Sequence, residues 1–169
     1  QPSAAADFRM RFFNPDGSEA DLCGNGARCI ARLAREIGAA PADMRIETAA
    51  GSVRAEILPA GVRLHLPPPK DWRLNLSMEW KNQKLPLHFV NSGVPHAVVV
   101  VADLAATDVP ALGAFIRRHA LFAPAGTNAD FIRIGGPAAL AIRTYERGVE
   151  AETLACGTGI VAAALVAEK

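Results

Sequence analysis

The chain has 169 residues, half of them hydrophobic, and carries a formal net charge of +1. Its length and apolar content suffice for one large domain or two small ones, and the near-neutral charge without a basic run does not indicate a nucleic-acid or anionic-membrane partner. No apolar stretch approaches the ~20 residues that a membrane helix requires. The three cysteines do not form the even set of a disulfide framework, so we expect a reducing, cytoplasmic location.

The first half of the chain predicts one helix among short strands. A strand is expected at 8–13 and ends at the turn Asn14-Pro15-Asp16-Gly17. The helix follows Cys23 and ends near Ile37, where Gly38 closes it. Three further strands, separated by glycine turns, are expected at 45–48, 52–58 and 62–66.

Three consecutive prolines, Pro67-Pro68-Pro69, interrupt the strands at this point. Proline cannot donate to a sheet ladder, so this segment is the candidate linker between domains. We therefore expect an N-terminal domain at 1–73 and a C-terminal domain at 74–169. Two tryptophans flank the linker, and we expect them to pack between the domains or on the surface: Trp72 and Trp80.

The second half predicts a similar succession of elements. A turn at 91–96 separates two strands, and a loop at 123–128 precedes the next pair. Apolar residues at helical spacing predict a helix at 108–119, and a last helix follows Cys156. The strands are expected at 85–90, 97–101, 130–134 and 138–145.

A Cys-Gly-polar-Gly motif occurs twice, once near each end of the chain. The copies are Cys23-Gly24-Asn25-Gly26 and Cys156-Gly157-Thr158-Gly159, and a helix-forming segment follows each. An aromatic residue and a polar residue precede each copy at similar spacing, as Phe13-Asn14 and Tyr145-Glu146. Such an internal repeat suggests two similar units, each offering one thiol to a shared site.

The position of each thiol before a helix suggests acid/base chemistry. Unpaired N–H groups and the positive end of the helix dipole are expected to lower the pKa of such a thiol toward neutrality, and they also bind carboxylates. Two such helix ends facing each other would remove a proton from one face of a carbon and return one to the other. A single copy of the motif would be weak, because most isolated cysteines are buried and inert. A structural zinc site would need paired Cys-x-x-Cys ligands, which are absent.

Several segments resemble the diaminopimelate epimerase family, in the family's order and over nearly the whole chain. Together they are highly specific, whereas any one alone would not be. They are Phe13-Asn14-Pro15-Asp16-Gly17-Ser18-Glu19, Cys23-Gly24-Asn25-Gly26-Ala27-Arg28-Cys29, Gly93-Val94-Pro95-His96, Gly126-Thr127-Asn128, Tyr145-Glu146-Arg147-Gly148 and Glu152-Thr153-Leu154-Ala155-Cys156-Gly157-Thr158-Gly159.

The resemblance implies an α/β (α+β) fold of two pseudo-symmetric domains, each a curved mixed sheet or barrel around a central helix. It implies an epimerase, independent of PLP and metal, that interconverts LL- and meso-diaminopimelate on the route to lysine and peptidoglycan precursors. Cys23 and Cys156 would be the catalytic acid/base pair, with His96 and Glu146 flanking the site. The implied contacts to this small amino-acid substrate are Asn14, Gly24, Asn25, Asn128, Glu146, Arg147, Gly157 and Thr158.

The chain also departs from the family. Val94 stands where some members have an asparagine that contacts substrate. A leading segment with a Gly-Asn-Asp-Phe motif, which precedes Phe8 in the family, is absent, as is a short tail, so we expect residues 1–66 to form an incomplete domain. Two other functions stay open: a related proline racemase-like isomerase with the same two thiols, and a non-catalytic amino-acid-binding remnant. The oligomeric state is open too, with a homodimer among the expectations.

The remaining cysteine and histidines have ordinary interpretations. Cys29 lies on the first helix without an evident partner, and we expect it in the core. Three scattered histidines are expected to be polar or packing residues: His65, His88 and His119.

Overall fold

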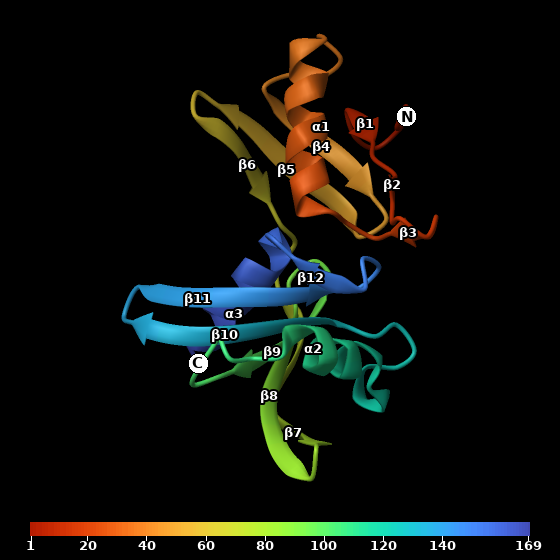
Figure 1. The fold of residues 1–169 in the computed structure, drawn as a ribbon. Coiled ribbons are helices and arrows are strands. Elements are labelled where there is room, and N and C mark those ends of the chain that lie inside the picture. The colour runs from red at the N-terminus through yellow and green to blue at the C-terminus, as the bar shows by residue number, and fades with distance from the viewer. The chain divides into compact units, whose positions relative to one another are not determined.

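The computed structural model describes residues 1–169, which divide into two compact units, Gln1–Pro68 and Pro69–Lys169. The expected boundary after residue 73 falls inside strand β7 (Lys70–Trp80), which belongs to the second unit. Each unit has its own sheet and is described by itself (Figure 1). None of the helices combines the length and the apolar character of a membrane span.

The first unit is built on a four-stranded mixed sheet in the order β1-β4-β5-β6. β1 is parallel to β4, and the other neighbours are antiparallel. Alternate side chains of the two middle strands are buried, as expected for strands with one covered face. The strands are β1 (Phe8–Arg9), β4 (Asp43–Thr48), β5 (Gly51–Leu58) and β6 (Gly61–His65).

Helix α1 (Gly24–Glu36) packs on this sheet through alanines. Ala27, Ala31 and Ala34 are buried, and their spacing places them on one face of the helix. The prediction that Cys29 is a core residue is wrong, because its side chain is exposed. Residue 29 lies two positions from both 27 and 31, and at 100° per residue this directs it away from the alanine face.

The single strand predicted at 8–13 is wrong, because the chain changes partner there. β1 pairs with β4, whereas β2 (Phe12–Phe13) pairs with β3 (Glu19–Ala20) in a separate two-stranded ribbon. The predicted turn at Asn14–Gly17 joins β2 to β3, so its closure takes the chain away from β4. Arg11 forms a bidentate ion pair with Glu19 across this ribbon.

The second unit is built on a six-stranded mixed sheet in the order β12-β11-β10-β9-β8-β7. Only β9 and β10 are parallel neighbours; every other pair is antiparallel. The α+β class with mixed sheets, expected from the sequence, is confirmed. The further strands are β8 (Gln83–Asn91), β9 (Pro95–Val100), β10 (Asn128–Gly136), β11 (Ala139–Glu146) and β12 (Ala151–Thr153).

Both faces of this sheet are covered, each by one helix. α2 (Val109–Arg118) packs on the face that carries Phe89, Val99 and Phe131. α3 (Gly157–Ala167) packs on the other face, against Val90, Val98 and Ile132. Because side chains alternate along a strand, β9 and β10 contribute to both cores from neighbouring positions. A short 3₁₀ helix, Ala120–Phe122, follows α2.

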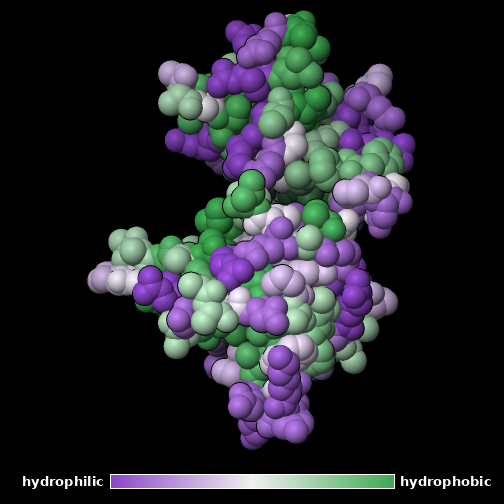
Figure 2. Space-filling view, in the orientation of Figure 1, coloured by the Kyte–Doolittle hydropathy of each residue, from purple (hydrophilic) through white to green (hydrophobic).

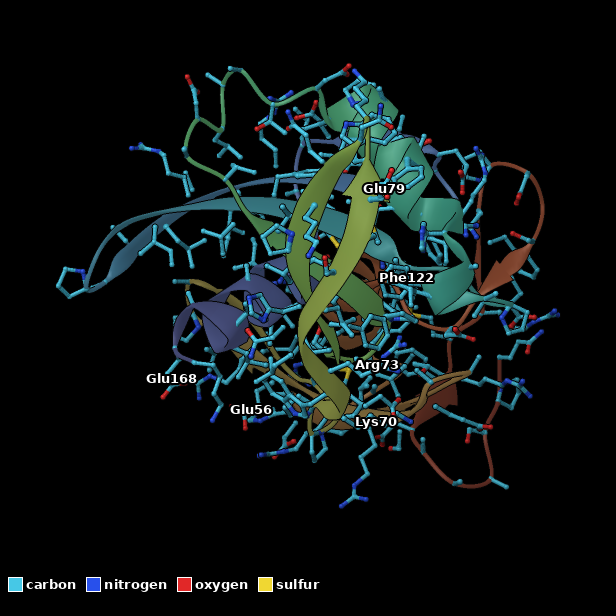
Figure 3. The ribbon with its side chains drawn as sticks, turned by 90° about the horizontal axis from the view of Figure 1, so that it is seen from below. Glu56, Lys70, Arg73, Glu79, Phe122 and Glu168 are labelled. Carbon is cyan, nitrogen blue, oxygen red and sulfur yellow. The ribbon has the colours of Figure 1, made fainter.

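Strand β7 was not expected from the sequence, although apolar residues alternate along it. Two register irregularities, between Lys70 and Arg73 and between Arg73 and Leu76, interrupt its pairing with β8. The guanidinium of Arg73 lies 4.2 Å from the centre of the Phe89 ring and also faces Phe122, labelled with Arg73 in Figure 3. The tip of the β7–β8 hairpin is hydrophilic (Figure 2).

The two tryptophans of β7 have different surroundings. Trp72 is partly exposed, in agreement with a surface position. Trp80 packs against Phe115 of α2, with the ring centres 4.7 Å apart and the ring planes tilted by 46°, and joins the core of the second unit. The expectation that Trp80 packs between domains or on the surface is therefore wrong, because the β7–β8 hairpin turns it toward α2.

Candidate active site

The two motif cysteines occupy the same structural position in their units. Cys23 is the N-cap of α1 with φ −120° and ψ 108°, and Cys156 is the N-cap of α3 with φ −118° and ψ 108°. Both are free thiols and both are partly buried. The repeated sequence motif thus corresponds to a repeated backbone conformation at the start of a helix.

The surroundings of the two sulfur atoms differ. Cys23 Sγ accepts a hydrogen bond from the backbone N–H of Gly26 at 3.3 Å, as an N-cap side chain does. Cys156 Sγ makes no capping bond and lies 3.5 Å from the Thr158 hydroxyl. The backbone N–H of Gly159 also acts on the Cys156 sulfur. The difference is therefore that only Cys156 has a side-chain hydroxyl as a neighbour.

A buried polar network lies at the start of α3, on the face of the sheet that α3 covers. His96 Nδ1 is 2.7 Å from Asp130 Oδ2, and His96 Nε2 is 2.9 Å from Thr158 Oγ1. The Thr144 hydroxyl donates to Asp130 Oδ1 at 2.7 Å, and the Ser92 hydroxyl donates to the carbonyl of Thr158 at 2.8 Å. β9, β10, β11, α3 and the turn between β8 and β9 thus each contribute a group, and the network is satisfied internally.

Burial raises the pKa of the Cys156 thiol to about 12. The hydrogen bonds with the Thr158 hydroxyl and with the backbone N–H of Gly159 act in the opposite direction, while the nearby carboxylates of Asp130 and Glu146 raise the pKa further. The expectation that a helix start lowers this pKa toward neutrality is therefore wrong for Cys156. Loss of hydration and two acidic neighbours outweigh the favourable end of the helix dipole.

Asn128 joins two segments that carry predicted site residues. Its Nδ2 donates to the carbonyl of Pro95 at 2.9 Å, and its Oδ1 accepts from the backbone N–H of Arg147 at 2.8 Å. The Arg147 guanidinium donates to the carbonyl of Ala125 at 3.2 Å. An amide side chain has a second N–H and a second lone pair, so Asn128 retains capacity for another partner.

The site residues expected in the first unit lie around the start of α1. Asn14 is in the β2–β3 turn, where its Nδ2 donates to the Ser18 hydroxyl at 3.0 Å. Gly24 and Asn25 form the first turn of the helix, and Asn25 Oδ1 accepts from Arg28. Gly157 and Thr158 occupy the corresponding first turn of α3.

Within the second unit the structure brings together Cys156, Thr158 and His96, and it places Glu146 close enough to act on the Cys156 thiol. Sequence reasoning missed Asp130, whose side chain has no exposed surface. The available signal was a single carboxylate between the apolar residues Ala129 and Phe131, at the start of a predicted strand. Buried charges are found with partners, so this position indicates a buried polar contact. No group of three or more His, Cys, Asp and Glu is placed to hold a metal ion.

Solved structures that share the fold include a probable proline racemase and a hydroxyproline epimerase. A probable proline racemase from Agrobacterium radiobacter K84 aligns with a TM-score of 0.76 at 23% identity, covering 99% of this chain and 58% of that one. A hydroxyproline epimerase from Agrobacterium vitis aligns with a TM-score of 0.76 at 21% identity, covering 98% of this chain and 56% of that one. At these identities the likeness shows the shared fold.

The relatives found by sequence are more similar to this chain than these solved structures are. The family model described as diaminopimelate epimerase matches residues 1–66 and 88–169. A diaminopimelate epimerase from Aquifex aeolicus is 45% identical over 163 residues, covering 95% of this chain. One from Chlorobaculum tepidum is 46% identical over 169 residues, covering 98% of it. The chain belongs to the diaminopimelate epimerase family, as its motifs indicated. It spans 58% and 64% of the lengths of these two relatives.

Proposed function

We propose that the protein interconverts LL- and meso-diaminopimelate by proton transfer at the α-carbon, with Cys23 and Cys156 as the two acid/base groups. The observation that carries this proposal is the matched N-cap geometry of the two cysteines. Its support is the family to which the chain belongs and the names of its relatives. One sulfur would act as thiolate and the other as thiol, and turnover in either direction would exchange them.

Recognition of the substrate follows from its charges. Diaminopimelate carries two ammonium and two carboxylate groups, so its site needs both signs of charge. Arg147 would grip a carboxylate through its planar fork, and Glu146 would bind an ammonium. Helix starts and side-chain amides would complete the contacts. The residues that would make them are Asn14, Gly24, Asn25, Asn128, Gly157 and Thr158.

The reaction needs a means to stabilise the carbanion formed when the α-proton leaves. Backbone amides and helix dipoles fixed around a water-poor site would do this without rearrangement during the reaction. We therefore propose that catalysis requires neither pyridoxal phosphate nor a metal. Both cysteines must be reduced for this mechanism, which is the reason for proposing a cytoplasmic location.

Single-alanine variants of the full-length protein test the two-thiol mechanism. Cys23→Ala and Cys156→Ala should each reduce epimerisation by several orders of magnitude, because one face of the α-carbon loses its acid/base group. Each variant should still exchange the α-hydrogen of one stereoisomer with D₂O, with opposite preference in the two variants. NMR measures both epimerisation and deuterium uptake.

Cys29→Ala is the matched control, because Cys29 is an exposed thiol on the same helix as the first motif. It should retain near-native epimerisation. Near-native epimerisation in either of the other two variants would show that the cysteine concerned is structural and that the two-thiol mechanism is wrong. Mild oxidation should join Cys23 to Cys156 and abolish activity reversibly, because thiolates are the oxidisable form.

A related proline racemase-like isomerase is the second candidate, favoured by the shared fold of the solved racemase and epimerase structures. It would use the same two thiols on a substrate without a charged distal end. Assays with LL-diaminopimelate, proline and 4-hydroxyproline separate the two. Turnover of a cyclic imino acid alone would replace the first proposal, and binding of diaminopimelate without turnover would indicate an amino-acid-binding role.

A further inference from the structure

We propose that Asp130, His96 and Thr158 form a buried proton relay that ends at the Cys156 sulfur, with Asp130 as the positioning residue. This inference deepens the proposed function, because it describes how one of the two catalytic thiols would gain and lose its proton. The relay is defined by contacts within the second unit alone. Asp130 and Thr158 thereby acquire roles that neither the motifs nor the relatives' names indicate.

The relay is an unbroken series of contacts. Asp130 Oδ2 to His96 Nδ1 is 2.7 Å, His96 Nε2 to Thr158 Oγ1 is 2.9 Å, and Thr158 Oγ1 to Cys156 Sγ is 3.5 Å. The side chains of Asp130 and His96 have no exposed surface, and Thr158 is 5% exposed. Water therefore does not compete along the inner part of the path, and a proton leaving the sulfur has an acceptor inside the protein.

The directions of the hydrogen bonds follow from the inner end of the relay. Thr144 donates to one oxygen of the Asp130 carboxylate, and the other oxygen accepts Nδ1–H from His96. His96 Nε2 is then an acceptor and takes the hydrogen of the Thr158 hydroxyl. The lone pairs of that hydroxyl face Cys156, so they accept its S–H. With Cys156 as a thiol, every hydrogen in the relay has one acceptor.

Loss of the Cys156 proton moves two protons along this path. The S–H bond breaks as that proton passes to Thr158 Oγ1, and the former hydroxyl proton passes to His96 Nε2. The products are a thiolate that accepts a hydrogen bond from Thr158 and an imidazolium held between Thr158 and the Asp130 carboxylate. Proton return reverses both steps, and the number of protons and the net charge of the relay do not change.

The positive charge of the imidazolium offsets the negative charges that surround Cys156. The charged or titratable groups facing this thiol are Asp130 from β10, Glu146 from β11 and, through Thr158, His96 from β9. Both carboxylates oppose a thiolate, and of these three groups His96 is the one that can supply a compensating positive charge. A thiolate formed together with an imidazolium is less costly than an isolated one, because an opposite charge nearby favours the charged form.

Thr158→Val tests the relay, because valine keeps the shape of threonine and removes the hydroxyl. The readout is the rate of Cys156 alkylation by iodoacetamide at constant pH, resolved by peptide mass spectrometry. Losing a charge-assisted hydrogen bond corresponds to about a tenfold or larger fall in thiolate population. We expect Cys156 labelling to fall by about this factor in Thr158→Val and to remain near the wild-type rate in Thr158→Ser.

Cys23 and Cys29 in the same chain serve as internal controls, because they lie in the first unit and outside the relay. Their labelling rates should not change, which separates a local effect from partial unfolding. An unchanged or faster Cys156 rate in Thr158→Val would overturn the proposal, as would a serine variant as slow as the valine variant.

NMR of ¹⁵N-labelled histidine in the unmodified protein provides a second test that needs no variant. We expect His96 to be the neutral Nδ1–H tautomer in the thiol state. An Nε2–H tautomer would overturn the proposal, because His96 could then not accept the Thr158 proton. Neither readout requires epimerase activity, so failure of the relay and failure of the proposed function are distinguishable.

Discussion

Gly159 lies so close to Asp130 that a Cβ atom on Gly159 would come within 2.6 Å of Asp130 Oδ1. The same oxygen accepts the hydrogen bond from Thr144 at 2.7 Å. The last glycine of the second Cys-Gly-polar-Gly motif thus gives the carboxylate room at the start of α3. In the first motif the equivalent glycine, Gly26, faces the side-chain ends of Phe12 and Met10 at 3.2 and 3.3 Å, which can move more easily.

Gly159→Ala should therefore displace Asp130 and break its bond with Thr144. Overpacking of a buried site costs roughly 1–3 kcal/mol, and a disturbed carboxylate adds to this. Urea denaturation should show a lower free energy of unfolding. Gly61→Ala is the control, because nothing lies within 4 Å of a Cβ atom at Gly61. Equal stability of the two variants would contradict the close packing of Gly159 on Asp130.

Gly113→Ala should destabilise the second unit through Tyr145. A Cβ atom at Gly113 would lie 2.4 Å from Tyr145 Cβ, which is fixed to the backbone of β11. Alanine is favoured over glycine in a helix by about 1 kcal/mol, but overpacking costs roughly 1–3 kcal/mol, so we expect a net loss. Thermal unfolding measures it, with Gly135→Ala as control because its nearest atoms are 3.6 Å away or farther. A more stable Gly113→Ala variant would show that helix propensity prevails.

Alkaline pH should destabilise the protein partly through Cys156, whose pKa burial raises from 9.0 to about 12. The folded thiol holds its proton more tightly than the unfolded thiol, so its contribution to stability is complete below pH 9 and is lost as the pH rises to about 12. Denaturation under reducing conditions at a series of pH values should show a smaller alkaline loss in Cys156→Ser than in the wild type. Cys29→Ser should follow the wild-type curve, because Cys29 is exposed. Parallel curves for the wild type and Cys156→Ser would contradict the raised pKa.

Arg147→Lys should weaken catalysis of the full-length protein although it keeps the charge, because lysine lacks the planar fork. Loss of a charged hydrogen bond of ~1.5–3 kcal/mol corresponds to a fall in kcat/KM of about 10- to 100-fold. The backbone N–H of Arg147, which Asn128 binds, is unaffected by the change. Arg133→Lys, at an exposed position of β10, is the control. An unchanged kcat/KM in Arg147→Lys would show that this guanidinium does not bind substrate.

Local signals predicted the helices well. Asp108 accepts from Ala111 N–H as the N-cap of α2, and the expected range 108–119 encloses the observed Val109–Arg118. The helix after Cys23 ends close to the expected residue, and Gly38 has φ +73° just beyond it. Caps and glycine stops act through neighbouring residues, so a sequence carries them directly.

The polar network could not be predicted in the same way. His96, Asp130 and Thr158 meet only because β9 and β10 are parallel neighbours and α3 covers the face to which they point. The order of strands in a sheet is a property of the whole unit. The sequence motifs contained His96 and Thr158, but they did not show that these residues meet. Which face of α1 is buried was equally hidden, because its small alanines give a weaker hydrophobic signal than the exposed Leu33 and Ile37.

The alternation along β10 makes the site depend on correct strand pairing during folding. Ala129 and Phe131 belong to the core beneath α2, while Asp130 between them points to the α3 side. A slip of one residue against β9 would exchange these roles, placing a carboxylate in an apolar core and a phenyl ring beside His96. Misregistered chains would therefore lose both hydrophobic burial and the polar network at once. The carboxylate that serves the relay also acts against misfolded pairings of its own strand.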